Sequence, residues 1–170
     1  MESTVSSLGC RVGRCPVFFL DVDGTLLPYG SAPGREAESA PPLERLDPRL
    51  GIRLASLPAE LVWATTWGDE ANTEIAPRLG LPRLPVVRWP EPSAAEERED
   101  RWFGVHWKTR ALVAWADGRP FVWADDEITG GDREWVLARH PGRALLHRVD
   151  PDRGLAETDF AVLREWLRTA

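Results

Sequence analysis

The chain has 170 residues, 43% of them hydrophobic and 28% charged, which excludes a disordered chain and is typical of a globular domain. Acidic residues outnumber basic ones, 27 to 21, so the net charge of −6 argues against broad, sequence-independent binding to nucleic-acid phosphates. No apolar run approaches the length of a membrane span, and we therefore expect no membrane partner. Cys10 and Cys15 lack zinc-ligand spacing and are expected to be ordinary thiols, as in a cytoplasmic protein.

The chain begins with a stretch that has no clear hydrophobic period. We expect residues 1–14 to form a flexible N-terminus and residues 15–170 to form one domain. Residues 16–21 form a short apolar run that predicts a strand buried on both faces. Asp21 and Asp23 stand at the end of this run, on the same side of the strand. Two carboxylates at one point repel each other, so the pair needs a cation or a shared proton; the alternative is that both serve only the turn backbone.

The next segments predict a loop, a helix and a second strand. Residues 28–42 are rich in Pro, Gly and Ser, and a loop of this length is either a lid or a plain surface connection. A helix is expected over 48–57, where leucines share one face. A buried strand is expected over 61–67, and it ends in the hydroxyls of Thr65 and Thr66.

The alternation of helices and strands continues through the middle of the chain. Residues 68–79 predict a helix, and residues 84–88 predict a third strand. Residues 90–104 form a polar connection, whose charged run we expect to be a solvated face. A helix is expected over 107–116, with Lys108 in its first turn.

The last part of the chain predicts a fourth buried strand over 121–124, which runs directly into Asp125 and Asp126. The remaining expected elements are a helix over 132–139, a fifth strand over 144–149 and a final helix over 158–168. Strands that alternate with helices predict an α/β fold, a Rossmann-like three-layer sandwich with about five mainly parallel strands and helices on both faces.

The polar residues at the strand ends should meet at one edge of this sheet, because parallel strands align their carboxyl ends. Oxygen ligands without His or Cys favour Mg²⁺, and a bound cation lets a phosphate approach several carboxylates. An aspartate can then act as nucleophile, a second one can move protons, and Thr and Lys can hold phosphoryl oxygens. The residue types therefore predict phosphoryl transfer by the group Asp21, Asp23, Thr65, Thr66, Lys108, Asp125 and Asp126.

The chain resembles the haloacid dehalogenase superfamily of aspartate-nucleophile phosphohydrolases over about residues 16–150. The resemblance rests on Asp-Val-Asp-Gly-Thr after the first strand, a strand-end Thr, a Lys that opens a helix, and an acidic pair after the fourth strand. It implies that Asp21 is the nucleophile and Asp23 the acid/base. It further implies a phosphate-binding hydroxyl, Thr65 or Thr66, a phosphate-orienting Lys108, and Mg²⁺ held by the group Asp21, Asp23, Asp125 and Asp126.

Within the superfamily, the chain is similar to the phosphatase-like domains of bacterial RNA-repair proteins. The similarity lies in the runs Leu61–Trp67, Trp107–Thr109 and Val122–Glu127. It implies a phosphorylated substrate, such as a nucleotide or a nucleic-acid end. Neither interval between the motifs is long enough for a large cap domain, and an open site goes with large substrates or with a homo-oligomer whose neighbour supplies the cap. The alternative from another class is a catalytically idle module that keeps the fold and binds a partner.

Overall fold

The computed structural model describes residues 15–30 and 42–170. The expected flexible segment 1–14 lies outside the described residues, as does the part 31–41 of the expected loop. Within the described part of the chain, no helix is long and apolar enough to cross a membrane. Cys15 is buried and disulfide-bonded, so the expectation of an ordinary thiol was wrong for this residue.

The centre of the fold is a four-stranded sheet in the order β2-β1-β3-β4, with every neighbouring pair parallel. β1 lies in the middle because its short apolar run can be buried on both faces and both edges. The α/β class and the parallel sheet are as predicted from the sequence. The strands are β1 (Val17–Leu20), β2 (Glu60–Trp63), β3 (Phe121–Asp125) and β4 (Ala144–Arg148).

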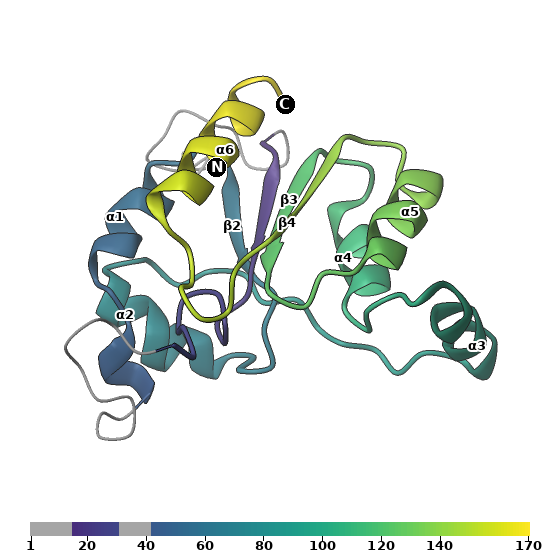
Figure 1. Ribbon diagram of the computed structural model, residues 1–170, viewed down its shortest axis with the longest axis horizontal. Coiled ribbons are helices and arrows are strands. Elements are labelled where there is room, and N and C mark those ends of the chain that lie inside the picture. Colours follow the sequence, from purple (N-terminus) through teal and green to yellow (C-terminus); the bar gives the residue numbers. More distant parts are fainter. Residues whose placement is uncertain (1–14, 31–41) are drawn as a thin grey trace, which may run out of the picture.

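Helices cover both faces of the sheet, which gives the three predicted layers (Figure 1). Successive residues of β1 point to opposite faces. Phe18 and Leu20 pack into one core, and Val17 and Phe19 pack into the other. The first core is closed by α1 (Arg49–Ala55), a short π-helix (Ala71–Ile75), α2 (Ala76–Leu79) and α6 (Glu157–Arg168), and the second by α4 (Thr109–Ala116) and α5 (Gly130–Arg139). A short 3-10 helix (Pro42–Arg45) precedes α1.

The third strand predicted from the sequence, over 84–88, is reduced to a single bridge. Val86 pairs with Trp63 beyond the end of the sheet, through a bond from the Trp63 N–H to the Pro85 carbonyl and one from the Val87 N–H to the Trp63 carbonyl. Pro85 has no N–H to donate, and a proline restricts pairing to the edge of a sheet. The segment therefore borders the sheet next to β2 without becoming a full strand.

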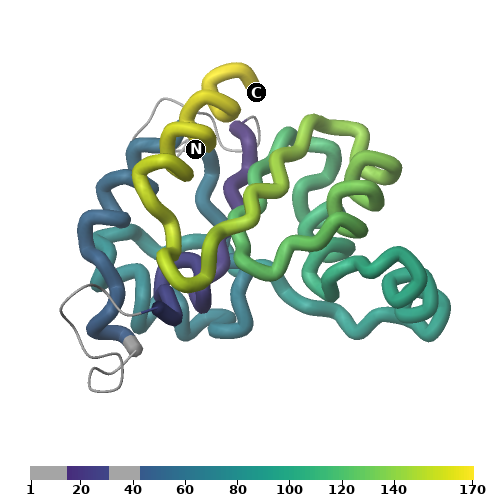
Figure 2. The backbone as a smooth tube through the Cα atoms, in the orientation of Figure 1, coloured from purple at the N-terminus to yellow at the C-terminus, as the bar shows by residue number. Residues whose placement is uncertain are grey.

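The polar connection over 90–104 contains a helix that its hydrophobic pattern does not predict. α3 (Ala94–Phe103) buries none of its residues, so the expectation of a solvated face is confirmed. Local contacts define both ends of the helix. Ser93 and Glu96 form a reciprocal capping box at its start, and Gly104 ends it at a φ of 65°. The chain crosses from α2 on one side of the sheet to α3 beside α5 on the other (Figure 2). This helix is the only added element between β2 and α4 outside the sheet layers, and no large cap is present in the described residues.

Candidate active site

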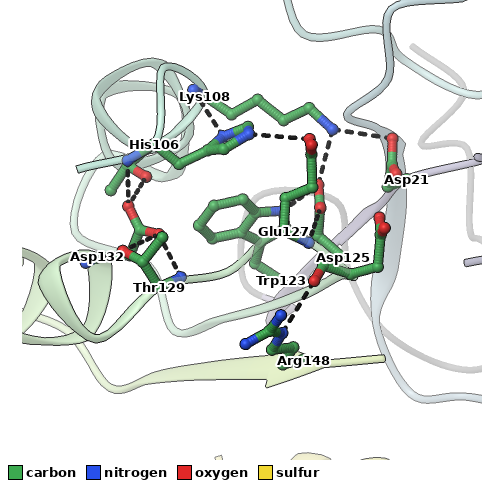
Figure 3. A network of polar contacts seen from close by, with 11 residues as sticks. Asp21, His106, Lys108, Trp123, Asp125, Glu127, Thr129, Asp132 and Arg148 are labelled. Carbon is green, nitrogen blue, oxygen red and sulfur yellow. Dashed lines mark hydrogen bonds and ion pairs between the residues drawn. The ribbon is translucent and has the colours of Figure 1, made fainter. Parts of the chain in front are cut away.

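The centre of the site is a buried ammonium group between two carboxylates (Figure 3). Lys108 Nζ lies 2.9 Å from Asp21 Oδ1 and 2.7 Å from Asp125 Oδ2. All three side chains are almost inaccessible to solvent: the lysine is 3% exposed, Asp21 is 8% and Asp125 is 0%. Buried charges persist when they are paired and hydrogen-bonded, and here one cation serves two anions. With both carboxylates ionised, these three side chains would carry a net negative charge inside the protein.

The position of these groups follows from the strand order. β1 ends at Leu20 and β3 at Asp125, and the two strands are neighbours in the sheet. The chain leaves β1 toward α1 on one face and leaves β3 toward α5 on the other. Their carboxyl ends therefore form a topological switch point, where open α/β sheets bind ligands. The Asp21 N–H also donates to the Ala124 carbonyl at 3.2 Å, which keeps the two strand ends together.

The electrostatics of the three groups are strongly perturbed. Burial, and then the charge of Asp125, raise the pKa of Asp21 to about 7, although Lys108 works in the opposite direction. Burial alone would lower the pKa of Lys108, but Asp21 and Asp125 outweigh it and raise that pKa. The lysine therefore stays charged, and without a further cation Asp21 holds a proton up to near-neutral pH.

A third carboxylate completes a candidate cation site. Carboxylate oxygens of Asp21, Asp125 and Asp126 lie within 4.8 Å of one another. Burial, and then the charge of Asp125, raise the pKa of Asp126. An all-oxygen donor set of this kind fits a hard divalent ion such as Mg²⁺. Gly24, at a φ of +72°, makes the cluster possible, because a Cβ there would lie 2.5 Å from the Asp126 carboxyl carbon.

Asp23, the fourth predicted metal ligand, does not contribute its carboxylate to this cluster. Its side chain is partly buried and accepts a hydrogen bond from Trp67 Nε1 at 2.9 Å. This contact joins residues 44 positions apart and fixes one oxygen of Asp23. No pattern around Asp23 or Trp67 in the sequence predicts it.

The two candidate phosphate-binding threonines lie in different surroundings. Thr65 is fully buried just beyond the end of β2, whereas Thr66 is exposed. Thr65 Oγ1 accepts a hydrogen bond from the Trp67 N–H at 3.3 Å, and the Thr65 carbonyl accepts one from Trp89 Nε1 at 3.3 Å. Because β2 ends at Trp63, the predicted strand over 61–67 was too long by four residues, and this segment turns near the site.

Asp132 holds the turn that carries Lys108 (Figure 3). It is completely buried at the start of α5, where the sequence predicts only a helix. One carboxylate oxygen accepts from the His106 N–H at 2.7 Å and from Thr109 Oγ1 at 2.6 Å. The other accepts from the Thr129 N–H at 2.7 Å. Asp132 thus ties the beginning of α4 to the beginning of α5 and sets the direction from which the lysine enters.

His106 supports the same turn from its other side. Its Nδ1 is 3.3 Å from the Lys108 N–H, and its Nε2 is 3.1 Å from a Glu127 carboxylate oxygen. The Glu127 N–H in turn donates to Asp125 Oδ1 at 2.9 Å, and Trp123 Nε1 reaches Asp125 Oδ2 at 3.2 Å. Asp125 is therefore held by three donors from different residues, which leaves its position well defined.

Two signals in the sequence could have strengthened the site prediction. Lys108 is the only lysine among 21 lysines and arginines. A compact ammonium can sit between two buried carboxylates where a planar guanidinium would not fit in the same way. Tyr29 is the only tyrosine. Burial, and then the charges of Asp126 and Asp23, raise the pKa of its hydroxyl, although the residue is 57% exposed.

Comparison with known families agrees with this geometry. A family model described as the HAD domain in Swiss Army Knife RNA repair proteins matches residues 17–160. The chain belongs to this family. The HAD assignment confirms the resemblance seen in the motifs and places the chain, at superfamily level, among HAD-type hydrolases and phosphatases. The matched range of this HAD domain includes every described side chain of the candidate site. No curated protein and no solved structure matches the chain.

Proposed function

We propose that this HAD domain is a Mg²⁺-dependent phosphohydrolase that acts through a phosphorylated aspartate. The observation that carries the proposal is the buried contact of Lys108 with Asp21 and Asp125 at the switch point of the sheet. A structural ion pair would need one carboxylate for one lysine, whereas here Lys108 pairs with two, and Asp126 brings a third carboxylate close to both of them. Such an excess of negative charge suits a site that is completed by a divalent ion and by a phosphate.

Asp21 supplies the nucleophile. One of its carboxylate oxygens attacks the phosphorus of a phosphate monoester, and the bond between phosphorus and the leaving oxygen breaks. The product of this step is an acyl-phosphate on Asp21 and an alcohol. Ionised Asp21 is required, and a cation held by Asp21, Asp125 and Asp126 would lower the pKa that burial raises to about 7.

Asp23 moves the protons. As a carboxylic acid it donates a proton to the leaving oxygen, and as a carboxylate it then takes a proton from the attacking water. The water oxygen bonds to phosphorus, the bond from phosphorus to Asp21 breaks, and inorganic phosphate leaves. Trp67 Nε1 binds one oxygen of Asp23, and we assign the proton transfer to the other oxygen.

The transferring phosphoryl oxygens carry negative charge that must be balanced. Lys108 provides a permanent charge, since its pKa is raised. The buried Thr65 is our candidate for the hydroxyl donor, and its exposed neighbour Thr66 is not. Asp21, Asp125 and Asp126 would hold Mg²⁺, which supplies charge stabilisation for the phosphoryl group when bound. The family description and these residues together support a nucleotide or a polynucleotide end as the source of the phosphate.

The test is hydrolysis of a generic aryl phosphate with Mg²⁺ and with excess chelator, in the wild type and in Asp21→Asn. We expect turnover only in the wild type with Mg²⁺. Asp117→Asn is the matched control, because Asp117 is exposed at the end of α4, just before β3 begins, and the site lies where β3 ends. Activity that persists in chelator or in Asp21→Asn would refute the mechanism. No turnover, together with no rise in melting temperature on adding Mg²⁺, would instead support an idle binding module.

A further inference from the structure

A pocket walled by two tryptophans lies directly beside the proposed phosphate site. Trp89 and Trp107 meet edge to face, with ring centroids 4.9 Å apart and planes at 75°. Pro90 and Pro92 also line the pocket, and its volume is about 220 Å³. Pockets for drug-sized ligands begin at roughly 300 Å³, so this one suits a single ring system.

The two tryptophans of the pocket contact residues that we assign to phosphate. Lys108 Nζ lies 5.6 Å from the centroid of the Trp107 ring, and the two residues are adjacent in the chain. Trp89 Nε1 donates to the Thr65 carbonyl at 3.3 Å. Trp107 therefore lies next to Lys108, and Trp89 is hydrogen-bonded to Thr65, so each tryptophan contacts one of the two proposed phosphate-holding residues.

The charges of the residues that line the pocket determine which ligands it can bind. Three acidic residues, Glu91, Glu96 and Asp100, line the pocket with one basic residue, Arg110. Arg110 is already engaged, since its Nε lies 2.6 Å from Asp100 and its other end pairs with Glu99. A second phosphate would be repelled here, whereas a neutral ring that carries amino groups would not.

The exposure of Trp107 is unusual for a residue next to a buried lysine. It is 49% exposed, although Lys108 and Thr109 beside it are buried. A large apolar ring that stays half exposed at the edge of a site is a platform on which another ring can stack. Trp89 is only partly buried and provides the second wall.

We propose that the Trp89–Trp107 pocket binds the base of a nucleoside phosphate while its phosphate lies at Asp21 and Lys108. This inference rests on the proposed phosphohydrolase function and names its substrate class. The tryptophan rings stack on a base, and the acidic residues of the lining repel any additional phosphate. We therefore expect the pocket to favour a nucleotide over a sugar phosphate. We also expect it to hold a single base and not several bases of a polynucleotide.

The kinetic test compares a nucleoside monophosphate with glycerol phosphate in the wild type, Trp107→Ala and Trp107→Phe. We expect Trp107→Ala to reduce the preference for the nucleotide by about tenfold, mainly through KM, and Trp107→Phe to retain most of it. Trp102→Ala is the matched control, because Trp102 on α3 is 84% exposed and does not line the pocket. Equal preference in all four proteins would overturn the proposal. Mononucleotides and 3′- or 5′-phosphorylated oligonucleotides are assayed separately. The comparison shows whether the base belongs to a free nucleotide or to the end of a polynucleotide.

A second measurement separates this inference from the proposed activity. Binding of an unphosphorylated nucleoside, adenosine, is measured by calorimetry without Mg²⁺ in the same proteins. Weaker binding in Trp107→Ala but not in Trp102→Ala supports the pocket even if no phosphate ester is hydrolysed. Normal aryl phosphate hydrolysis together with no adenosine binding that depends on Trp107 overturns the pocket and leaves the phosphohydrolase proposal intact.

Discussion

Replacing Lys108 by Met is expected to destabilise the metal-free protein strongly. The substitution keeps the length and the apolar stem of the side chain but removes the charge between Asp21 and Asp125. Both carboxylates lose a hydrogen bond, at 2.9 and 2.7 Å, in a place where water does not replace it. Removing one partner of a buried ion pair costs about 3–5 kcal/mol, because the other charge is left buried without compensation.

The loss should depend on pH in a defined direction. In the wild type the pKa of Asp21 is raised from 3.8 to about 7, and loss of the lysine raises it further. A carboxyl group with a higher pKa in the folded than in the unfolded state loses stability as the pH rises between those two values. At pH 5 Asp21 is protonated in the folded variant, so the cost is smaller and comes from the lost partner of the buried Asp125. At pH 8 Asp21 must either ionise in a buried site without the lysine or stay protonated at a pH where the unfolded chain is ionised. Either way the loss in the free energy of unfolding is large.

The assay is urea unfolding of the wild type and of Lys108→Met at pH 5 and pH 8, with and without Mg²⁺. We expect the difference in the free energy of unfolding to be larger at pH 8 and to shrink when Mg²⁺ is added, since the ion replaces the missing charge. Arg119→Met is the control: it removes a partly exposed pair with Glu60 at 2.7 Å, for which about 1 kcal/mol or less is expected. A loss for Lys108→Met that does not change between pH 5 and pH 8 would refute this account of the site.

Three further predictions concern residues around the cluster. Trp67→Phe keeps an aromatic ring but removes the N–H that binds Asp23 and reduces the ring that packs against the core, and we expect kcat for an aryl phosphate to fall by about tenfold with little change in KM; an unchanged kcat would argue against positioning by this bond. Asp132→Asn should lower the free energy of unfolding by about 2–3 kcal/mol in urea titrations, because it weakens a fully buried acceptor; a loss below about 0.5 kcal/mol would be inconsistent with its bonding. Tyr29 is the only tyrosine, so absorbance follows its ionisation directly; Mg²⁺ should lower its pKa by neutralising the carboxylates that raise it, and a pKa insensitive to Mg²⁺ would place the ion elsewhere.

Much of the site could be predicted because its residues occupy strand ends. A short apolar run followed by an acid is visible in the sequence at Asp21 and again at Asp125, and parallel strands bring such ends together. The position of Lys108 near the start of a helix was predicted from the helix expected over 107–116. Its contact with both acids depends on the strand order, which places β3 beside β1.

The parts that could not be predicted depend on contacts between distant residues or on single atoms. The bond from Trp67 to Asp23 spans 44 residues, and the one from His106 to Asp132 spans 26, so no local period reports them. The strand expected over 84–88 fails because of the missing N–H of Pro85, which an apolar pattern does not register. α3 was missed for the opposite reason, since its caps form it without an apolar face.

The most direct test of the central claim is to trap the phosphorylated enzyme. The protein is mixed with an aryl phosphate and Mg²⁺, quenched in acid within the first turnover, and digested for peptide mass spectrometry. We predict a phosphate adduct on the peptide that contains Asp21, which is absent from Asp21→Asn and from samples with excess chelator. Turnover without an adduct at Asp21, or an adduct on another residue, would contradict the assignment of Asp21 as the nucleophile.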